Sequence, residues 1–210
     1  MENKFSLDLF TQIPLIGIIR GFDQNQTTHI LEQFLSAGLT TIEITLNTPN
    51  ALEIIKKSSE KFGGKLNVGA GTVCTMDDLK KALDAGAQFI VTPIFDSEII
   101  TFCKENGVPV FPGAFSPTEI YQAWSLGATM VKVFPGGLLG AQYIKEVKGP
   151  LQEIKLLPTG GVGLSNIEEF IRAGADGFGL GGALIDKILV ENEDWKGLKS
   201  HFEKFVAKLK

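Results

Sequence analysis

Four segments of this sequence repeat one pattern, in which a glycine is followed within a few residues by a short apolar run. The pattern occurs at residues 37–44, 85–92, 126–133 and 173–180. A glycine of this kind commonly ends a helix because it can adopt the left-handed conformation, and a β-branched run after it is typical of a buried strand. Each repeat therefore predicts the junction between a helix and a strand, as in the βα units of a parallel sheet.

Further strands are predicted between these repeats. Short apolar runs lie at residues 14–20, 66–71, 109–112 and 155–159. With the repeats they make eight βα units, which favour an α/β fold of the (β/α)₈ or TIM-barrel type, and residues 1–210 suffice for one such domain. The residues through Leu9 and Phe10 are expected to form a short helix under the barrel, and an amphipathic helix is expected from about Trp195 to Lys210.

An open, doubly wound sheet is the alternative to the barrel. Sheets of that kind that bind dinucleotides carry a glycine-rich turn directly after their first strand. Here Gly69-Ala70-Gly71-Thr72 follows the third predicted strand and lacks the full spacing of the dinucleotide motif. The regular repeat therefore favours the closed barrel.

Composition and charge argue against nucleic-acid and membrane partners. The chain has 20 Lys and Arg against 24 Asp and Glu, so its net charge of −4 provides no basic field for polyanions. No apolar run approaches the roughly 20 residues of a membrane-spanning helix. Cys74 and Cys103 form no CxxC pair, and residues 1–4 lack the apolar stretch of a signal peptide. These features predict a cytoplasmic protein with no membrane or nucleic-acid partner.

Two charged residues lie within strands that should be apolar on both faces. Strand side chains alternate, so the isoleucines on either side of Glu43 point one way and Glu43 points the other. The isoleucines suit the surrounding helices, which places Glu43 inside the barrel. The valines on either side of Lys132 place that lysine inside in the same way, together with Met130 and Phe134. A glutamate and a lysine are therefore expected to share one interior.

A buried salt bridge, or a strand register opposite to the one chosen, is the alternative reading of this pair. Buried ion pairs are poor stabilisers, because desolvation costs several kcal/mol per ion. Desolvation also lowers the pKa of a lysine and leaves the free amine that attacks a carbonyl, whereas a nearby carboxylate holds the lysine charged. The pair points to catalysis by Lys132 and Glu43, and the balance between these two influences on the pKa of Lys132 stays open.

Glycine pairs follow the last two predicted strands, where barrels of this type commonly bind phosphate. Backbone N–H groups without side chains can approach an anion closely. Arg20 ends the first strand and could pair with a carboxylate or phosphate, and Thr72 after the third could donate a hydroxyl, although both residue types are also common in ordinary turns. The expected substrate-binding residues are Arg20, Thr72, Thr159, Gly160, Gly161, Gly181 and Gly182.

No metal site or other cofactor is predicted. His29 and His201 lie in helix-like segments, far from the predicted strand ends and from other ligand-type residues. No paired acidic residues lie at strand ends, where a carboxylate site for a hard cation would need them.

Eight short motifs run along almost the whole chain in a specific order and spacing. They are GIIRG (17–21), IEITL (42–46), VGAGTV (68–73), FIVTP (89–93), FPG (111–113), VKVFP (131–135), PTGGV (158–162) and GLGG (179–182). In this order the chain resembles the 2-keto-3-deoxy-6-phosphogluconate aldolases, which also act on 4-hydroxy-2-oxoglutarate.

The resemblance implies a Schiff-base, or class I, aldolase. Lys132 would match the family's Schiff-base lysine and Glu43 its general acid/base. Thr72 would contact the pyruvate portion of the substrate, and the glycine loops its phosphate. The implied reactions release pyruvate, with glyceraldehyde 3-phosphate from the phosphogluconate derivative or glyoxylate from 4-hydroxy-2-oxoglutarate. The family is typically homotrimeric, so the expected partners are a phosphorylated keto acid and two further copies of the chain.

One position departs from the gluconate type. Many such members carry an arginine for the substrate carboxylate where this sequence has Asn47. The stretch Leu46-Asn47-Thr48-Pro49, with Arg20, looks like the related 2-keto-3-deoxy-6-phosphogalactonate aldolases, whereas Pro158-Thr159-Gly160-Gly161 favours the gluconate type. The two substrates differ at one hydroxyl-bearing carbon, so both stay open. A barrel isomerase or synthase without a covalent intermediate, and a sugar-phosphate binding module, are further alternatives.

Overall fold

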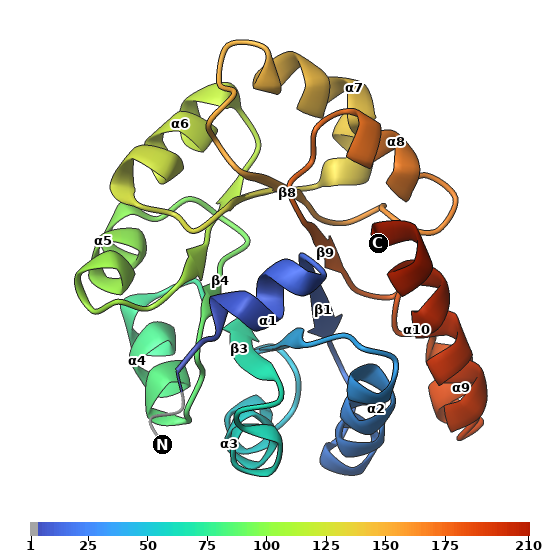
Figure 1. Cartoon of the computed structure of the whole chain (residues 1–210). Helices are drawn as coiled ribbons and strands as arrows, with labels where there is room; N and C mark the ends of the chain where they lie inside the picture. Colours follow the sequence, from blue (N-terminus) through green and yellow to red (C-terminus); the bar gives the residue numbers. More distant parts are fainter. Residues whose placement is uncertain (1–3) are drawn as a thin grey trace.

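Parallel strands form an inner ring in this protein, and helices surround it (Figure 1). The computed structural model describes residues 4–210, so residues 1–3 of the segment considered for a signal peptide lie outside it. The strands are β1 (Leu15–Ile19), β2 (Thr41–Thr45), β3 (Asn67–Gly71), β4 (Ile90–Val91), β5 (Val110–Phe111), β6 (Gly113–Ala114), β7 (Val131–Val133), β8 (Leu156–Pro158) and β9 (Phe178–Leu180). The helices are α1 (Leu7–Gln12), α2 (Gln24–Ser36), α3 (Ala51–Phe62), α4 (Met76–Asp84), α5 (Ser97–Glu105), α6 (Pro117–Leu126), α7 (Gly136–Lys148), α8 (Ile167–Arg172), α9 (Lys187–Glu191) and α10 (Trp195–Leu209).

The ring of strands closes through two short junctions. Hydrogen bonds join one sheet in the order β5-β4-β3-β2-β1-β9 and a second in the order β6-β7-β8. Strands β5 and β6 are separated by Pro112 alone, whose carbonyl accepts a hydrogen bond of 2.8 Å from the N–H of Lys132. A parallel bridge between Thr159 and Gly179 links the end of β8 to β9. The predicted (β/α)₈ barrel is confirmed, and its fifth strand, predicted at 109–112, is two short strands that reach Ala114.

The glycines of the repeated pattern end helices, as predicted. Gly38, Gly86, Gly127 and Gly174 have φ angles of 88°, 91°, 106° and 93° and come at or just after the ends of α2, α4, α6 and α8. Residues with a side chain rarely adopt these φ angles. Glycine therefore allows each helix to end there and the chain to turn into the next strand.

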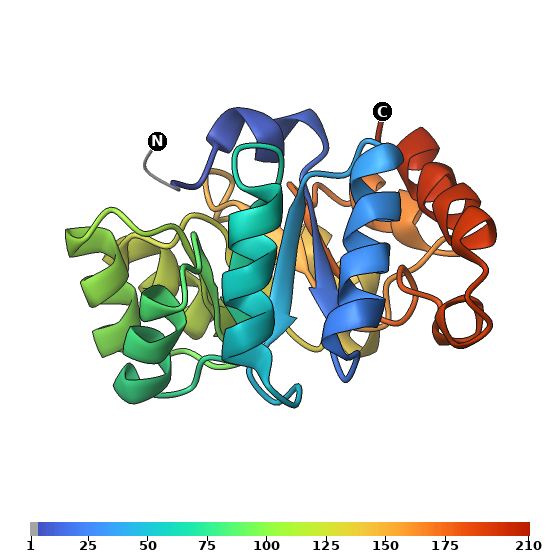
Figure 2. The same cartoon turned by 90° about the horizontal axis from the view of Figure 1, so that it is seen from below.

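Apolar side chains fill the barrel in two separate layers. The outer layer, between strands and helices, contains the two isoleucines that flank Glu43 and the two valines that flank Lys132. The inner layer is a plug at the amino ends of the strands, and it consists of Phe10, Ile16, Phe89, Val91, Phe111, Met130 and Leu157. Helix α1, the predicted short helix, lies across this end and opposite to the strand arrowheads (Figure 2). The plug leaves only the carboxyl ends of the strands for a pocket.

The last helix covers the outside of the barrel next to α2. It spans Trp195–Leu209, close to the predicted 195–210, and the ring of its Phe202 lies 5.6 Å from that of Phe34 on α2. Within residues 4–210, no helix has both the length and the apolar character needed to span a membrane.

Candidate active site

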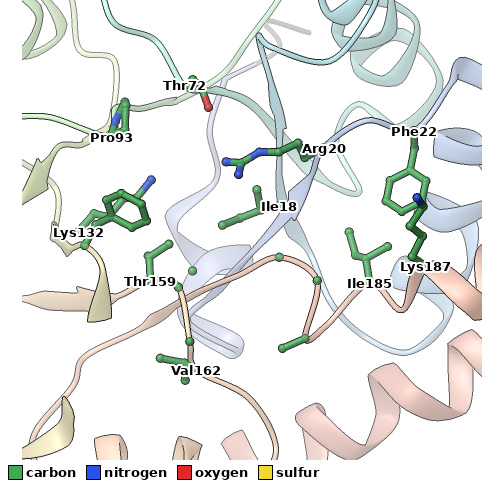
Figure 3. Close-up of a pocket in the computed structure, with 17 residues that line it drawn as sticks. Ile18, Arg20, Phe22, Thr72, Pro93, Lys132, Thr159, Val162, Ile185 and Lys187 are labelled. Atoms are coloured by element: carbon green, nitrogen blue, oxygen red, sulfur yellow. The ribbon is translucent and has the colours of Figure 1, made fainter. Parts of the chain in front are cut away.

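A pocket of about 390 Å³ opens at the carboxyl ends of the strands (Figure 3). Its lining comes from β1, β7 and β9, from the loops that follow β1, β3, β4, β7, β8 and β9, and from the start of α9. Eight of the nine predicted site residues line it, and these are Arg20, Thr72, Lys132, Thr159, Gly160, Gly161, Gly181 and Gly182. The ninth, Glu43, lies beneath the pocket floor.

Lys132 extends from β7 into the barrel interior. Its backbone pairs with Gly113 and Leu157 on the neighbouring strands, and the residue is only 5% exposed. The Nζ atom lies 5.3 Å from the ring centroid of Phe134, which lines the pocket with 41% of its surface exposed. Met130 is buried as the strand alternation predicted, but Phe134 lies at the pocket rather than inside the core, because β7 ends at Val133.

Glu43 is 1% exposed and faces the same interior from β2. Together with Lys132 and Thr159 it lines a small cavity of about 10 Å³, close to the smallest volume that seats one water molecule. Its Oε2 has no hydrogen-bond partner among the described residues. A side-chain carbon added at Gly71 would lie 2.5 Å from the Glu43 Cδ, so the missing side chain there makes room for the carboxyl group.

Burial shifts the pKa values of both interior groups toward their uncharged forms. It lowers the pKa of the Lys132 amine; the carboxylate of Glu43 opposes this change, and the guanidinium of Arg20 adds to it. It likewise raises the pKa of Glu43, against the opposing charges of Lys132 and Arg20. For both groups desolvation therefore outweighs the opposing charges, which answers the question that the sequence left open.

Arg20 and Thr72 approach the pocket from β1 and β3. The side chain of Arg20 is exposed, and its guanidinium extends toward Thr72 and Lys132 (Figure 3). The neighbouring N–H of Gly21 donates a 3.0 Å hydrogen bond to the buried hydroxyl of Thr48, which fixes the backbone there. Thr72 has a φ of 60°, which is unusual for a β-branched residue and is most often tolerated at functional sites.

The loop after β8 presents backbone N–H groups to the pocket. Gly160 and Gly161 have φ angles of 81° and 73°. The parallel bridge between Thr159 and Gly179 directs the N–H of Gly160 toward the carbonyl of Gly179, whereas no described residue accepts a hydrogen bond from the N–H of Gly161. Gly181 and Gly182 line the same side of the pocket from the loop after β9. Both predicted glycine pairs therefore meet at one place, where their amides can bind an anion.

Several lining residues were missed by the sequence analysis. Phe22 and Ile185 give one end of the pocket an apolar wall, and Lys187 adds a cation at the start of α9, 3.3 Å from the carboxylate of Glu191 (Figure 3). No local sequence signal distinguishes Lys187 from other surface lysines, because the path of the loop after β9 decides where it lies. Asn47 is exposed and does not line the pocket.

The two histidines have ordinary structural contacts. The ring of His29 stacks on Trp195 with centroids 4.8 Å apart, and a ring nitrogen of His201 lies 2.9 Å from the carbonyl of Ala183. Across residues 4–210, no group of three His, Cys, Asp or Glu side chains has an arrangement that could hold a metal ion.

Two curated proteins are similar in sequence to this chain along most of its length. The 2-dehydro-3-deoxy-6-phosphogalactonate aldolase of Escherichia coli is 36% identical over 175 residues, covering 83% of this chain and 85% of its own. The 2-dehydro-3-deoxy-phosphogluconate aldolase of Pseudomonas aeruginosa is 35% identical over 185 residues, covering 87% and 82%.

Solved structures and a family model agree with these relatives. A native KDPGal structure matches with a TM-score of 0.88 at 32% identity, covering 98% of this chain and 96% of its own. A KDPG aldolase from Legionella pneumophila, with pyruvate captured as a covalent carbinolamine, matches with a TM-score of 0.86 at 25% identity, covering 93% and 95%. The family model for KDPG and KHG aldolases matches residues 8–200. The chain belongs to the KDPG and KHG aldolase family.

Proposed function

We propose that this protein cleaves 2-keto-3-deoxy-6-phosphogluconate to pyruvate and glyceraldehyde 3-phosphate through a Schiff base on Lys132. One observation carries the proposal: a buried lysine, whose pKa is lowered by burial, lies at the bottom of a pocket whose wall contains two glycine loops. The amine can attack a ketone, and the loops can bind a phosphate on the same molecule. The covalent pyruvate adduct in the Legionella relative supports the same chemistry.

The reaction begins when the Nζ of Lys132 attacks the C2 ketone of the substrate. Loss of water leaves an iminium, which accepts the electron pair released when the C3–C4 bond breaks. Glu43, directly or through a water in the small cavity beside it, takes the proton of the C4 hydroxyl, and the aldehyde leaves. The pyruvate enamine is then protonated at C3, and hydrolysis of the iminium releases pyruvate and the free lysine. Glu43 can serve successive steps because a base in one step is an acid in the next.

The remaining site residues bind the two ends of the substrate. Thr72 donates its hydroxyl to the pyruvate portion, and Arg20 pairs with an anionic group near Lys132. The phosphate binds to the amides at the far ends of β8 and β9, which are Gly160, Gly161, Gly181 and Gly182, with Thr159 beside them. No cofactor is needed for this sequence of steps, because the iminium formed on Lys132 accepts the electron pair.

A second substrate is favoured by one sequence feature and one relative. Asn47 replaces the arginine of many gluconate-type members, and the galactonate-type enzyme of Escherichia coli is as similar to this chain as the gluconate-type enzyme of Pseudomonas aeruginosa. Initial rates with the two phosphorylated sugar acids, and with 4-hydroxy-2-oxoglutarate, rank the three substrates by kcat/KM.

Trapping with borohydride tests the covalent mechanism. When the protein is incubated with pyruvate and sodium borohydride, intact mass and peptide mapping are expected to show one reduced pyruvate adduct per chain, on Lys132. Borohydride without pyruvate is the control. A folded protein that forms no adduct would instead support a barrel isomerase or synthase that works without a covalent intermediate, and ligand binding without turnover would support a binding module.

We further propose that the chain acts as a single-domain subunit of a cytoplasmic homotrimer. Four large apolar side chains are exposed just after strands β4, β6 and β7. Ile94, Phe115 and Phe134 lie on loops and are exposed by 48%, 49% and 41%, and Leu138 lies in the first turn of α7 and is exposed by 79%. Exposed apolar groups of this kind mark protein interfaces. Light scattering after gel filtration is expected to give about three times the chain mass of 22.7 kDa. Leu138→Glu should reduce this mass, and a mass of 22.7 kDa for the unchanged chain would contradict the trimer.

A further inference from the structure

A glycine pair at the start of α7 lies against the backbone of the loop after β8. A side-chain carbon added at Gly137 would lie 2.6 Å from the Cα and 2.9 Å from the carbonyl oxygen of Gly161. A carbon added at Gly161 would lie 2.8 Å from the Cα of Gly137. Real side-chain carbons essentially never make such short contacts, so the two backbones can approach this closely only because both residues are glycine.

Hydrogen bonds hold the carbonyl groups of this loop. The N–H of Gly136 donates to the carbonyl of Thr159 at 2.7 Å, and the N–H of Gly137 donates to the carbonyl of Gly160 at 2.6 Å. The side-chain amide of Asn166 donates to the carbonyl of Gly161 at 2.9 Å. The start of α7 therefore holds the first two carbonyl groups of the loop, and Asn166 before α8 holds the third.

This arrangement decides where the N–H groups of the loop point. In a trans peptide the N–H and C=O of one unit point in opposite directions. Because the carbonyls of Thr159 and Gly160 accept hydrogen bonds from α7, the N–H groups of Gly160 and Gly161 point away from that helix. The N–H of Gly160 faces the carbonyl of Gly179 on β9, and the N–H of Gly161 is left for the pocket that this residue lines. Within residues 4–210 the N–H of Gly161 has no acceptor, so it is available to a ligand.

We propose that Gly136 and Gly137 are positioning residues that hold the loop after β8 in its anion-binding conformation. Neither glycine lines the pocket, so they act on the substrate only through Gly160 and Gly161. The inference rests on the proposed aldolase function. It predicts that their replacement weakens the binding of the phosphate and leaves the reaction of Lys132 with pyruvate unchanged, because the lysine lies on β7 outside this contact.

The test compares Gly137→Ala with Gly149→Ala at the other end of α7, where the atom nearest to an added carbon is the carbonyl oxygen of Glu146 at 3.3 Å. For Gly137→Ala we expect KM for the phosphorylated sugar acid to rise by about tenfold to a hundredfold, the usual effect of losing a hydrogen bond to a charged group. Competitive inhibition by inorganic phosphate should weaken by a similar factor. Pyruvate trapping by borohydride should stay within about twofold of the unchanged protein. KM for 4-hydroxy-2-oxoglutarate should do the same, because neither molecule carries a phosphate for the loop to bind.

The outcomes separate this inference from the proposed function. If the unchanged protein traps no pyruvate, the aldolase function itself is wrong. If it traps pyruvate and Gly137→Ala leaves KM and phosphate inhibition unchanged, the positioning role is wrong and the function stands. An equal loss with phosphorylated and unphosphorylated substrates would also overturn the positioning role. Should Gly137→Ala fail to fold, Gly136→Ala meets its nearest atom at 3.0 Å and must show the same split, in a smaller degree.

Discussion

Lys132→Ala is expected to abolish aldol cleavage and to prevent the trapping of pyruvate by borohydride. The amine is the only group in the proposed mechanism that forms a bond to the substrate, so no other side chain can supply the electron sink. The variant is expected to lose all of the rate acceleration that the covalent intermediate provides. A coupled assay for pyruvate should therefore detect no measurable kcat. The same variant should keep its fold, because removing the lysine takes away a charge that lowers the pKa of Glu43, so the buried carboxyl group can take up a proton more easily.

Thermal unfolding of Lys132→Ala provides the check on its fold, and Lys80→Ala provides a matched control. Lys80 is an exposed lysine on α4, away from the pocket lining, so its replacement should change neither kcat nor trapping. Substantial turnover by folded Lys132→Ala would rule out the Schiff-base mechanism. An adduct that maps to another lysine would assign the nucleophile to that residue instead.

Glu43→Gln is expected to lower kcat by about 10² to 10⁴, the usual range for a general acid/base. The amide is close in size to the carboxyl group and fits the space that Gly71 provides, but it cannot take the proton of the C4 hydroxyl. Pyruvate trapping should be slower but should still reach one adduct per chain, because Lys132 remains. Full activity in this variant would remove Glu43 from the mechanism.

The pH dependence gives a second measurement of the role of Glu43. As a base it must be deprotonated, and burial raises its pKa, so kcat should fall as the pH drops through that raised value. Glu43→Gln should lose this acidic limb of the profile. Glu60→Gln, at an exposed position on α3, should keep both the limb and the rate.

The barrel and its two interior charges could be predicted because they follow from local rules. A glycine that ends a helix and a β-branched run that begins a strand are visible in a few residues, and alternation along β2 and β7 places Glu43 and Lys132 inside. The break in the fifth strand was not predicted, although its cause is local: Pro112 has no N–H to donate to a sheet.

The missing parts of the site depend on long-range geometry. Lys187 reaches the pocket because of the path of the loop after β9, and the contact between Gly137 and Gly161 joins residues far apart in the sequence. The direction of the pKa shift at Lys132 also depends on how deeply that residue is buried and on the positions of its charged neighbours. Sequence patterns show neither how deeply Lys132 is buried nor where its charged neighbours lie.

The aromatic plug around Phe10, Phe89 and Phe111 leaves the barrel with a single opening. The pocket is closed at the end where Lys132 and Glu43 lie, and it opens at the carboxyl ends of the strands. In the proposed mechanism the two products of cleavage are formed one above the other, with pyruvate attached at the bottom. The aldehyde must leave first, and in the synthetic direction pyruvate must enter first. The closed floor thereby favours the same order of loading and unloading that the proposed covalent bond to Lys132 requires.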